Sequence, residues 1–354
     1  MKNNKSSSLL GFLILASIAM GFFGSCNNDD SASSVGKLEI ASISKAMSSS
    51  NPVKIEDNDS ITAIGYPGIT YIIKGSGFAS LKHIYFNDKE SYFNPTMVTD
   101  NAIFVAINSD TPYENGSGEL KLVTNNGTVV YPFIIGPPAP VVSGFNPVNA
   151  VEGDIITIKG KFFLNPTVTF GNTVVAPLSS TLEEIKVKVP AGADKKYVKV
   201  TNITGFSTSY YAIGTQFFDD VAYNGYDFPD WNNYTLEKDG TAVQGLIYIR
   251  KKLGGYDSLQ GNWSWDDKLS DYAGIRITIR GSVPGTLKFV FNGDWSERNM
   301  LAITTEWKTF FIPWSELGNP SAVQNFSFQN FTKTANGDGL TNTIDIDNIG
   351  YYLK

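Results

Sequence analysis

The sequence predicts an all-β protein built from three successive β-sandwiches, and three observations support this prediction. Along the chain, short segments of alternating apolar and polar residues are interrupted by Gly, Asn and Pro, which is typical of all-β sandwiches. The first 215 residues contain two copies of one order of motifs. The C-terminal part also alternates with period two and shows no sustained helical period.

The N-terminus has the features of an exported lipoprotein. An apolar run over residues 9–23 follows two lysines and precedes Cys26, the only cysteine of the chain. This arrangement is a secretory signal, and the run is shorter than the roughly 20 residues of a membrane span. The segment resembles a bacterial lipobox, which implies that residues 1–26 end in cleavage before Cys26 and that Cys26 becomes the lipid anchor. The alternative is an ordinary signal peptide with an incidental cysteine.

Residues 27–36 are rich in Asn, Asp and Ser and predict a flexible tether. Their first four residues resemble the surface-export signal of Bacteroidetes lipoproteins. That resemblance implies a lipid-anchored protein of the outer membrane, exposed at the cell surface and in contact with the membrane only through its anchor.

The composition argues against several functions. The formal net charge is −6 and no run of Lys or Arg is present, so a nucleic-acid partner is not expected. A single histidine, His83, argues against a zinc site and against histidine-based triads, and we expect it to be a surface residue. No cofactor is expected to be required.

The internal repeat divides the first 215 residues into two domains. Residues 73–78 (IKGSGF) correspond to residues 158–163 (IKGKFF), and residues 120–125 (LKLVTN) correspond to residues 198–202 (VKVTN). A repeat of this length sets the number of domains.

The order of motifs in each copy resembles the IPT/TIG family, an immunoglobulin-like module. The resemblance implies two tandem immunoglobulin-like sandwiches, which we place at residues 37–136 and 137–214. Because such modules serve as spacers in many exported proteins, the resemblance says little about a ligand.

The C-terminal domain is expected to cover residues 215–354. Segments at residues 245–250, 275–280 and 287–291 alternate with period two, which places one set of side chains in a core and the other on an exposed or concave face. We predict a single sandwich of the jelly-roll type.

All six tryptophans lie in this domain, and four have the surroundings of exposed loops. Trp231, Trp263, Trp265 and Trp295 are each surrounded by Asn, Asp, Ser or Gly. An exposed indole ring is costly unless it meets a partner, and the i, i+2 spacing of Trp263 and Trp265 puts both rings on one face of an extended segment. We therefore predict that these four rings stack on sugar faces; the alternative is that some of them cap the ends of the sandwich.

Polar neighbours of these rings are expected to hydrogen-bond sugar hydroxyls, namely Asp230, Arg250, Asn262 and Asp266. Trp307 and Trp314 alternate with charged residues, and their surroundings resemble those in the galactose-binding-like jelly rolls of carbohydrate-binding modules. The resemblance implies packing or rim roles for both.

The whole layout resembles the surface glycan-binding proteins of Bacteroidetes polysaccharide-utilisation loci, in particular the type with a xyloglucan-binding C-terminal domain. The resemblance implies a non-catalytic lipoprotein that captures a hemicellulose or β-glucan such as xyloglucan. It also implies an outer-membrane glycan transporter and its lid lipoprotein as partners.

Two other functions and one metal site remain open at the level of the sequence. A small glycoside hydrolase would need two carboxylates about 5 to 9.5 Å apart, and an adhesin would bind a host protein. A structural calcium ion could be held by oxygen ligands from Asp219, Asp220, Asp345 and Asp347, although four surface acids at strand ends would look the same in the sequence.

Overall fold

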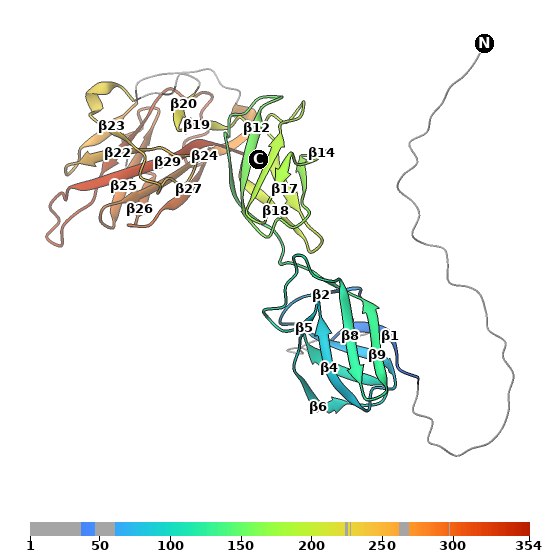
Figure 1. The fold of residues 1–354 in the computed structure, drawn as a ribbon. Helices are drawn as coiled ribbons and strands as arrows, with labels where there is room; N and C mark the ends of the chain where they lie inside the picture. The colour runs from blue at the N-terminus through green and yellow to red at the C-terminus, as the bar shows by residue number, and fades with distance from the viewer. Residues whose placement is uncertain (1–36, 47–60, 224–225, 227, 262–268, 297) are drawn as a thin grey trace, which may run out of the picture. The chain divides into compact units, whose positions relative to one another are not determined.

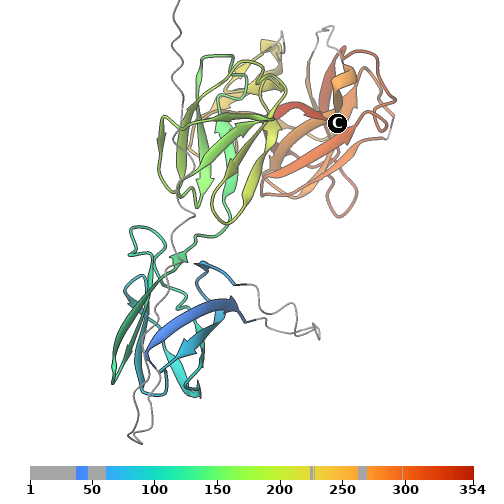
Figure 2. The ribbon, with the colours of Figure 1, turned by 90° about the vertical axis from the view of Figure 1, so that its right-hand side faces the viewer.

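The structure is a computed structural model, and it describes residues 37–46, 61–223, 226, 228–261, 269–296 and 298–354. This part of the chain consists of strands joined by turns, together with two short 3-10 helices, η2 (Asp230–Asn232) and η3 (Leu269–Asp271) (Figures 1 and 2). The all-β prediction is confirmed. The buried apolar side chains form three separate clusters, which span residues 40–135, 142–213 and 217–351.

The first cluster lies within two four-stranded sheets and a short two-stranded one. The first sheet has the order β1-β3-β7-β6, the second β5-β4-β8-β9, and the small parallel pair is β10-β2. The bounds are β1 Glu39–Lys45, β2 Ile64–Gly65, β3 Thr70–Ser76, β4 Leu81–Phe86, β5 Lys89–Glu90, β6 Phe93–Val98, β7 Ala102–Ala106, β8 Glu119–Thr124, β9 Gly127–Pro132 and β10 Ile134–Ile135.

The second cluster lies between two four-stranded sheets with related topology. Their orders are β11-β12-β16-β15 and β14-β13-β17-β18. The bounds are β11 Val141–Asn146, β12 Ile155–Lys161, β13 Thr167–Phe170, β14 Thr173–Val175, β15 Ser179–Ser180, β16 Glu184–Lys188, β17 Tyr197–Thr201 and β18 Phe206–Ala212.

The repeated Lys-Gly pair has the same structural cause in both copies. A Cβ atom on Gly75 would lie 1.9 Å from the Glu39 carbonyl oxygen of the neighbouring strand, and one on Gly160 would lie 1.9 Å from that of Val141. In each copy the neighbouring strand shifts register at this point. A side chain cannot be accommodated where the two backbones approach so closely, so both copies require glycine there.

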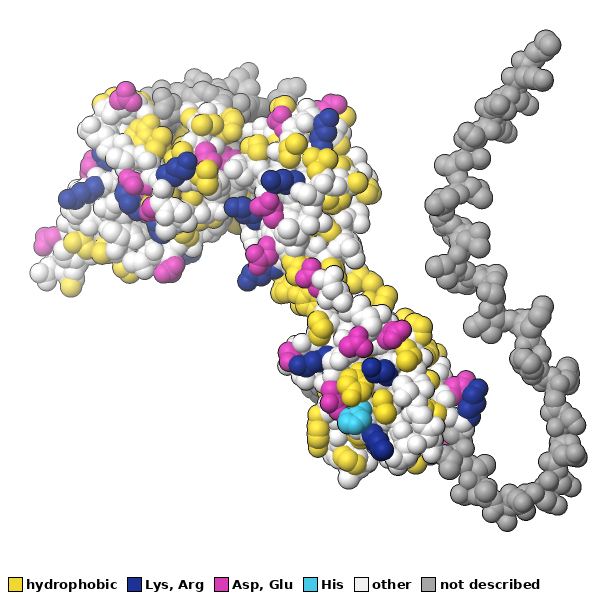
Figure 3. All heavy atoms as spheres, in the orientation of Figure 1, with side chains coloured by type: hydrophobic (Ala, Val, Ile, Leu, Met, Phe, Trp, Pro, Cys, Tyr) yellow, Lys and Arg dark blue, Asp and Glu magenta, His cyan; other side chains and the backbone are white. Residues whose placement is uncertain are grey.

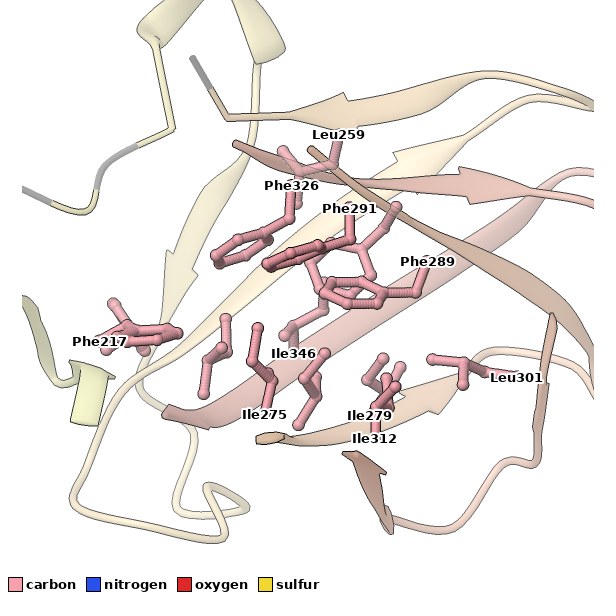
Figure 4. Close-up of a cluster of buried hydrophobic side chains, with 14 of the residues drawn as sticks. Phe217, Leu259, Ile275, Ile279, Phe289, Phe291, Leu301, Ile312, Phe326 and Ile346 are labelled. Carbon is pink, nitrogen blue, oxygen red and sulfur yellow. The ribbon is translucent and has the colours of Figure 1, made fainter. Parts of the chain in front are cut away.

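The third cluster fills a sandwich of a seven-stranded and a four-stranded sheet. Phe289, Phe291 and Phe326 of the smaller sheet face Ile275, Ile279 and Ile346 of the larger one (Figure 4). The larger sheet contains β19 Gln216–Asp219, β20 Val221–Ala222, β21 Thr235–Glu237, β22 Tyr248–Leu253, β24 Tyr272–Gly281, β27 Lys308–Pro313 and β29 Asn342–Leu353. The smaller sheet has the order β23-β28-β25-β26, with bounds β23 Ser258–Gln260, β25 Gly285–Phe291, β26 Met300–Ile303 and β28 Phe326–Asn330.

Two predictions about single residues are clear in the fold. Trp314 packs against the third core and donates its indole N–H to the Tyr272 carbonyl (2.8 Å), which is the packing role expected for it. His83, cyan in Figure 3, is exposed, and its Nδ1 lies 2.6 Å from Glu90 Oε1.

No helix among the described residues is long and apolar enough to cross a membrane. The expected signal, Cys26 and the tether fall within residues 1–36, outside the described part of the chain.

Candidate functional site

The outer face of the four-stranded sheet in the C-terminal sandwich carries a ladder of polar side chains. Across this face, Ser258 pairs with Gln329, and Gln329 pairs with Lys288. In the next row, Gln260 pairs with the buried Ser327, and Ser327 pairs with the buried, apolar Val290. Alternation in each strand sends the intervening residues into the core and the five polar ones outward. We call these five polar residues the polar face.

Trp231 lies at the β23 edge of the polar face, held there by its neighbour Asn232. The buried side chain of Asn232 donates to the Gln260 carbonyl (2.9 Å) and accepts from the Gln260 N–H (2.8 Å). The Asn232 side chain thus makes the two hydrogen bonds with the Gln260 backbone that a neighbouring strand would make. Trp231 precedes it in the short helix η2. The Trp231 side chain is 55% exposed.

Trp295 lies beyond the other side of the sheet, in the loop between β25 and β26, and is 48% exposed. The ammonium group of Lys288 donates to the Trp295 carbonyl and also lies 5.1 Å from the centroid of the Phe331 ring. Lys288 is buried although it faces away from the core. Its charge is therefore placed between an aromatic ring and the loop that carries Trp295.

A second aromatic group borders the same face at the start of β23. Tyr256, which is 48% exposed, meets Phe331 edge to face at a centroid distance of 5.3 Å. Gln329 of the polar face donates to the Tyr256 carbonyl (2.9 Å). Lys288, Gln329 and Tyr256 were not among the predicted binding residues. The signal available for Lys288 was its outward position in the alternating segment 287–291.

Four of the predicted binding residues, Asn262, Trp263, Trp265 and Asp266, lie outside the described residues. The chain enters that segment from Gly261, whose N–H donates to the Phe326 carbonyl (3.0 Å) directly after β23. The segment therefore starts at the edge of the polar face that Trp231 borders, and the roles of its residues stay predictions.

The other two predicted polar residues, Asp230 and Arg250, have different surroundings. Asp230 is exposed beside Trp231 in η2. Arg250 lies on the outer face of the seven-stranded sheet, where its guanidinium pairs with Asp345 (2.7 Å) and donates to the Tyr248 hydroxyl (2.7 Å). The carboxylate of Asp345 raises the pKa of Arg250. Asp230 therefore lies next to Trp231, whereas Arg250 lies on the other sheet in an ion pair with Asp345.

The four carboxylates considered for calcium are each engaged by protein donors. Asp345 bridges two arginines, and Asp220 accepts from the N–H groups of Leu246 and Ile247. Asp219 accepts from a backbone N–H, and Asp347 from three. Within the described ranges, no group of three or more His, Cys, Asp or Glu side chains is placed to hold a metal ion. Calcium binding stays a prediction.

Asp294, which precedes Trp295 in the sequence, has an environment unlike that of a catalytic acid. Asp294 pairs with Arg298 at 2.6 Å, and hydrogen bonds from Ser296 together with that guanidinium lower the pKa of Asp294. A general acid for glycoside cleavage requires a raised pKa.

We expect replacement of Asn232 by alanine to lower the free energy of unfolding by about 2 kcal/mol, because two partly buried carbonyls and one partly buried N–H lose their partner. Urea denaturation measures this. The matched control is Asn233→Gly, which keeps the left-handed conformation at φ 52° and should change the free energy by less than about 0.5 kcal/mol. Equal stability of Asn232→Ala and the unchanged chain would contradict the anchoring role.

Comparisons with known proteins agree with this architecture. Residues 140–217 match the family model of the IPT/TIG domain. A surface glycan-binding protein from Prevotella bryantii superposes with a TM-score of 0.50 at 16% identity, over 90% of this chain and 99% of the other.

Two curated relatives match over parts of their length. An IPT/TIG domain-containing protein from Bacteroides ovatus is 23% identical over 47% of this chain and 32% of its own length. A cyclomaltodextrin glucanotransferase from Bacillus sp. (strain 17-1) is 33% identical over 29% of this chain and 15% of its own length. The chain thus spans less than a third of either relative. It is an all-β protein whose residues 140–217 match the IPT/TIG domain, and it has the fold of the Prevotella bryantii surface glycan-binding protein.

Proposed function

We propose that the chain is a non-catalytic protein that captures a polysaccharide on the polar face of its C-terminal sandwich. The observation that carries this proposal is the combination of hydrogen-bonding side chains on the face with exposed aromatic rings around it. Trp231 and Trp295 lie at its margins, and Tyr256 lies at the start of β23. Sugar C–H faces stack on such rings, while the partly exposed side chains of Gln260 and Gln329 bind the hydroxyls.

The ligand class that we propose is a β-glucan or another hemicellulose, such as xyloglucan. An extended chain of this kind presents flat apolar faces to rings arranged along a sheet. Each ring can bury part of its ~150–250 Å² at roughly 25 cal/mol per Å². After the cost of immobilising the glycan, we expect dissociation constants on the order of micromolar to millimolar.

The cellular setting follows from the N-terminal sequence. Cys26 would anchor the protein in the outer membrane at the cell surface, and captured glycan would pass to an outer-membrane transporter with its lid lipoprotein. Many anchored copies and many repeats of one ligand supply avidity to sites of modest affinity.

A non-catalytic role has two supports. The common fold with a surface glycan-binding protein favours binding, and the match to a glucanotransferase covers only 15% of that enzyme. The lowered pKa of Asp294 is also the wrong direction for a general acid.

Affinity electrophoresis of the full chain in gels containing xyloglucan, mixed-linkage β-glucan or mannan tests the function. We expect retardation in at least one of the gels, without release of reducing ends. Absence of retardation in every gel, together with binding to a host protein, would favour an adhesin. Release of reducing ends would overturn the non-catalytic assignment.

A further inference from the structure

A cavity of about 660 Å³ lies at the first sandwich, far in sequence from the polar face. Most of its lining comes from the first sandwich: the end of β1, the turn between β2 and β3, and the loop between β7 and β8. The Pro-rich segment that follows β10 and Thr204, in the turn between β17 and β18, complete the lining. Ligand-binding cavities for small organic molecules have volumes of about 300–1,000 Å³, so this cavity has the size of a binding site.

The walls of the cavity are fixed by hydrogen bonds and close packing. The turn that carries Tyr66 is held by the Tyr71 hydroxyl, which lies 3.0 Å from the Tyr66 backbone nitrogen. The Tyr66 ring packs so closely on Gly136 that a Cβ atom there would lie 2.7 Å from it. The opposite loop is tied by the Asn87 amide, which donates to the Pro112 carbonyl (2.8 Å). A wall that is ordered before binding lowers the entropic cost of binding.

The lining combines two aromatic rings with charged groups. Tyr66 and Tyr113 are both partly exposed, and Lys45 and Asp110 contribute charges of opposite sign. Lys89 pairs with Asp110 at 2.8 Å and lowers the pKa of that carboxyl, which keeps Asp110 ionised as a hydrogen-bond acceptor. Partly exposed rings beside an acceptor and a donor match the apolar faces and hydroxyl edges of a pyranose.

We propose that this cavity is a second carbohydrate site, which stacks a short segment of the captured polysaccharide, about two sugar units, on Tyr66 and Tyr113 and hydrogen-bonds it through Asp110. The inference rests on the proposed function, because the same polysaccharide would occupy both sites. Two sites on one chain make the second contact intramolecular, so binding to a long polymer is tighter than binding to a short oligosaccharide.

The test compares a polymer with an oligosaccharide on variants of the full chain. For Tyr113→Ala, we expect the apparent affinity for xyloglucan in affinity electrophoresis to fall about tenfold. Calorimetry with a xyloglucan heptasaccharide should show that the polar face keeps its affinity while one binding site per chain is lost. Tyr113→Phe, which keeps the ring, should restore most of the affinity. The matched control is Tyr92→Ala, an 84% exposed tyrosine of the same sandwich that does not line the cavity.

A second variant separates this inference from the proposed function. Unchanged polymer affinity and unchanged stoichiometry in a folded Tyr66→Ala, Tyr113→Ala variant would overturn the second site and leave the proposed function intact. Absence of retardation of the unchanged chain by xyloglucan, mixed-linkage β-glucan and mannan would overturn both.

Discussion

A chain in which Trp231 and Trp295 are both replaced by alanine should lose detectable retardation by the polysaccharide that it binds. Both rings are about half exposed and lie at the margins of the polar face. Removing one stacking ring should cost about 1.5–3 kcal/mol of binding free energy, which is roughly a tenfold to hundredfold loss of affinity. Removing both should push a micromolar to millimolar interaction beyond detection by affinity electrophoresis.

The same variant should remain folded, because neither ring belongs to the buried core. Circular dichroism and thermal melting check this. The matched control is Phe311→Ala, an aromatic residue that is 49% exposed on β27 of the other sheet. Full retardation of the folded double variant would show that these rings are not the platform; equal loss in the Phe311 control would point to a nonspecific effect of removing surface rings.

Much of the fold could be predicted from local pattern alone. The alternation in residues 287–291 is visible in neighbouring residues alone, and it predicts a strand. The structure has β25 in that segment. The repeated glycines Gly75 and Gly160 were visible as a motif, but their cause was not. That cause is the approach of a neighbouring strand's carbonyl oxygen, which depends on a pairing over more than 15 residues of sequence.

The site was predictable only in part, for the same physical reason. The polar residues around Trp231 and Trp295 predicted exposed loops, because local composition alone indicates a loop. Both rings are about half exposed in the structure. Strand pairing, however, is non-local. It places Lys288 beside Gln329 and gives Arg250 a partner, Asp345, that lies 95 residues away. Neither relation has a signal in a single sequence.

The second large effect concerns stability and arises from buried charges beside the second sandwich. Arg276 of β24 is fully buried, with its guanidinium carbon 5.0 Å from the centroid of the Tyr211 ring. Asp219 accepts from the Val148 N–H (2.9 Å), and Asp347 is fully buried nearby. Burial raises the pKa of Asp219 to about 6 and that of Asp347 to about 7, and the charge of Asp219 adds to the shift at Asp347.

These shifts make the folded chain bind protons that the unfolded chain releases. Both pKa values lie above the ordinary value of 3.8, so between about pH 4 and pH 7 the folded state holds more protons than the unfolded state. The contribution of the two groups to stability is therefore fully present below about pH 4. It is lost as pH rises through about 6 and 7, when burial disfavours the newly formed charges.

Asp219→Asn isolates this contribution, because the amide oxygen can still accept from the Val148 N–H while the side chain no longer ionises. Relative to the unchanged chain, the variant's free energy of unfolding should rise by about 1.4 kcal/mol between pH 5 and pH 8. Urea denaturation at both pH values measures the difference, and Asp338→Asn, an exposed carboxylate of the same sandwich, is the matched control. A difference between Asp219→Asn and the unchanged chain that does not vary with pH would mean that Asp219 has the same pKa in both states. Any remaining loss of stability between pH 5 and pH 8 would then have to come from Asp347. At Asp347 burial raises the pKa, while three backbone N–H groups favour the ionised form and oppose that effect.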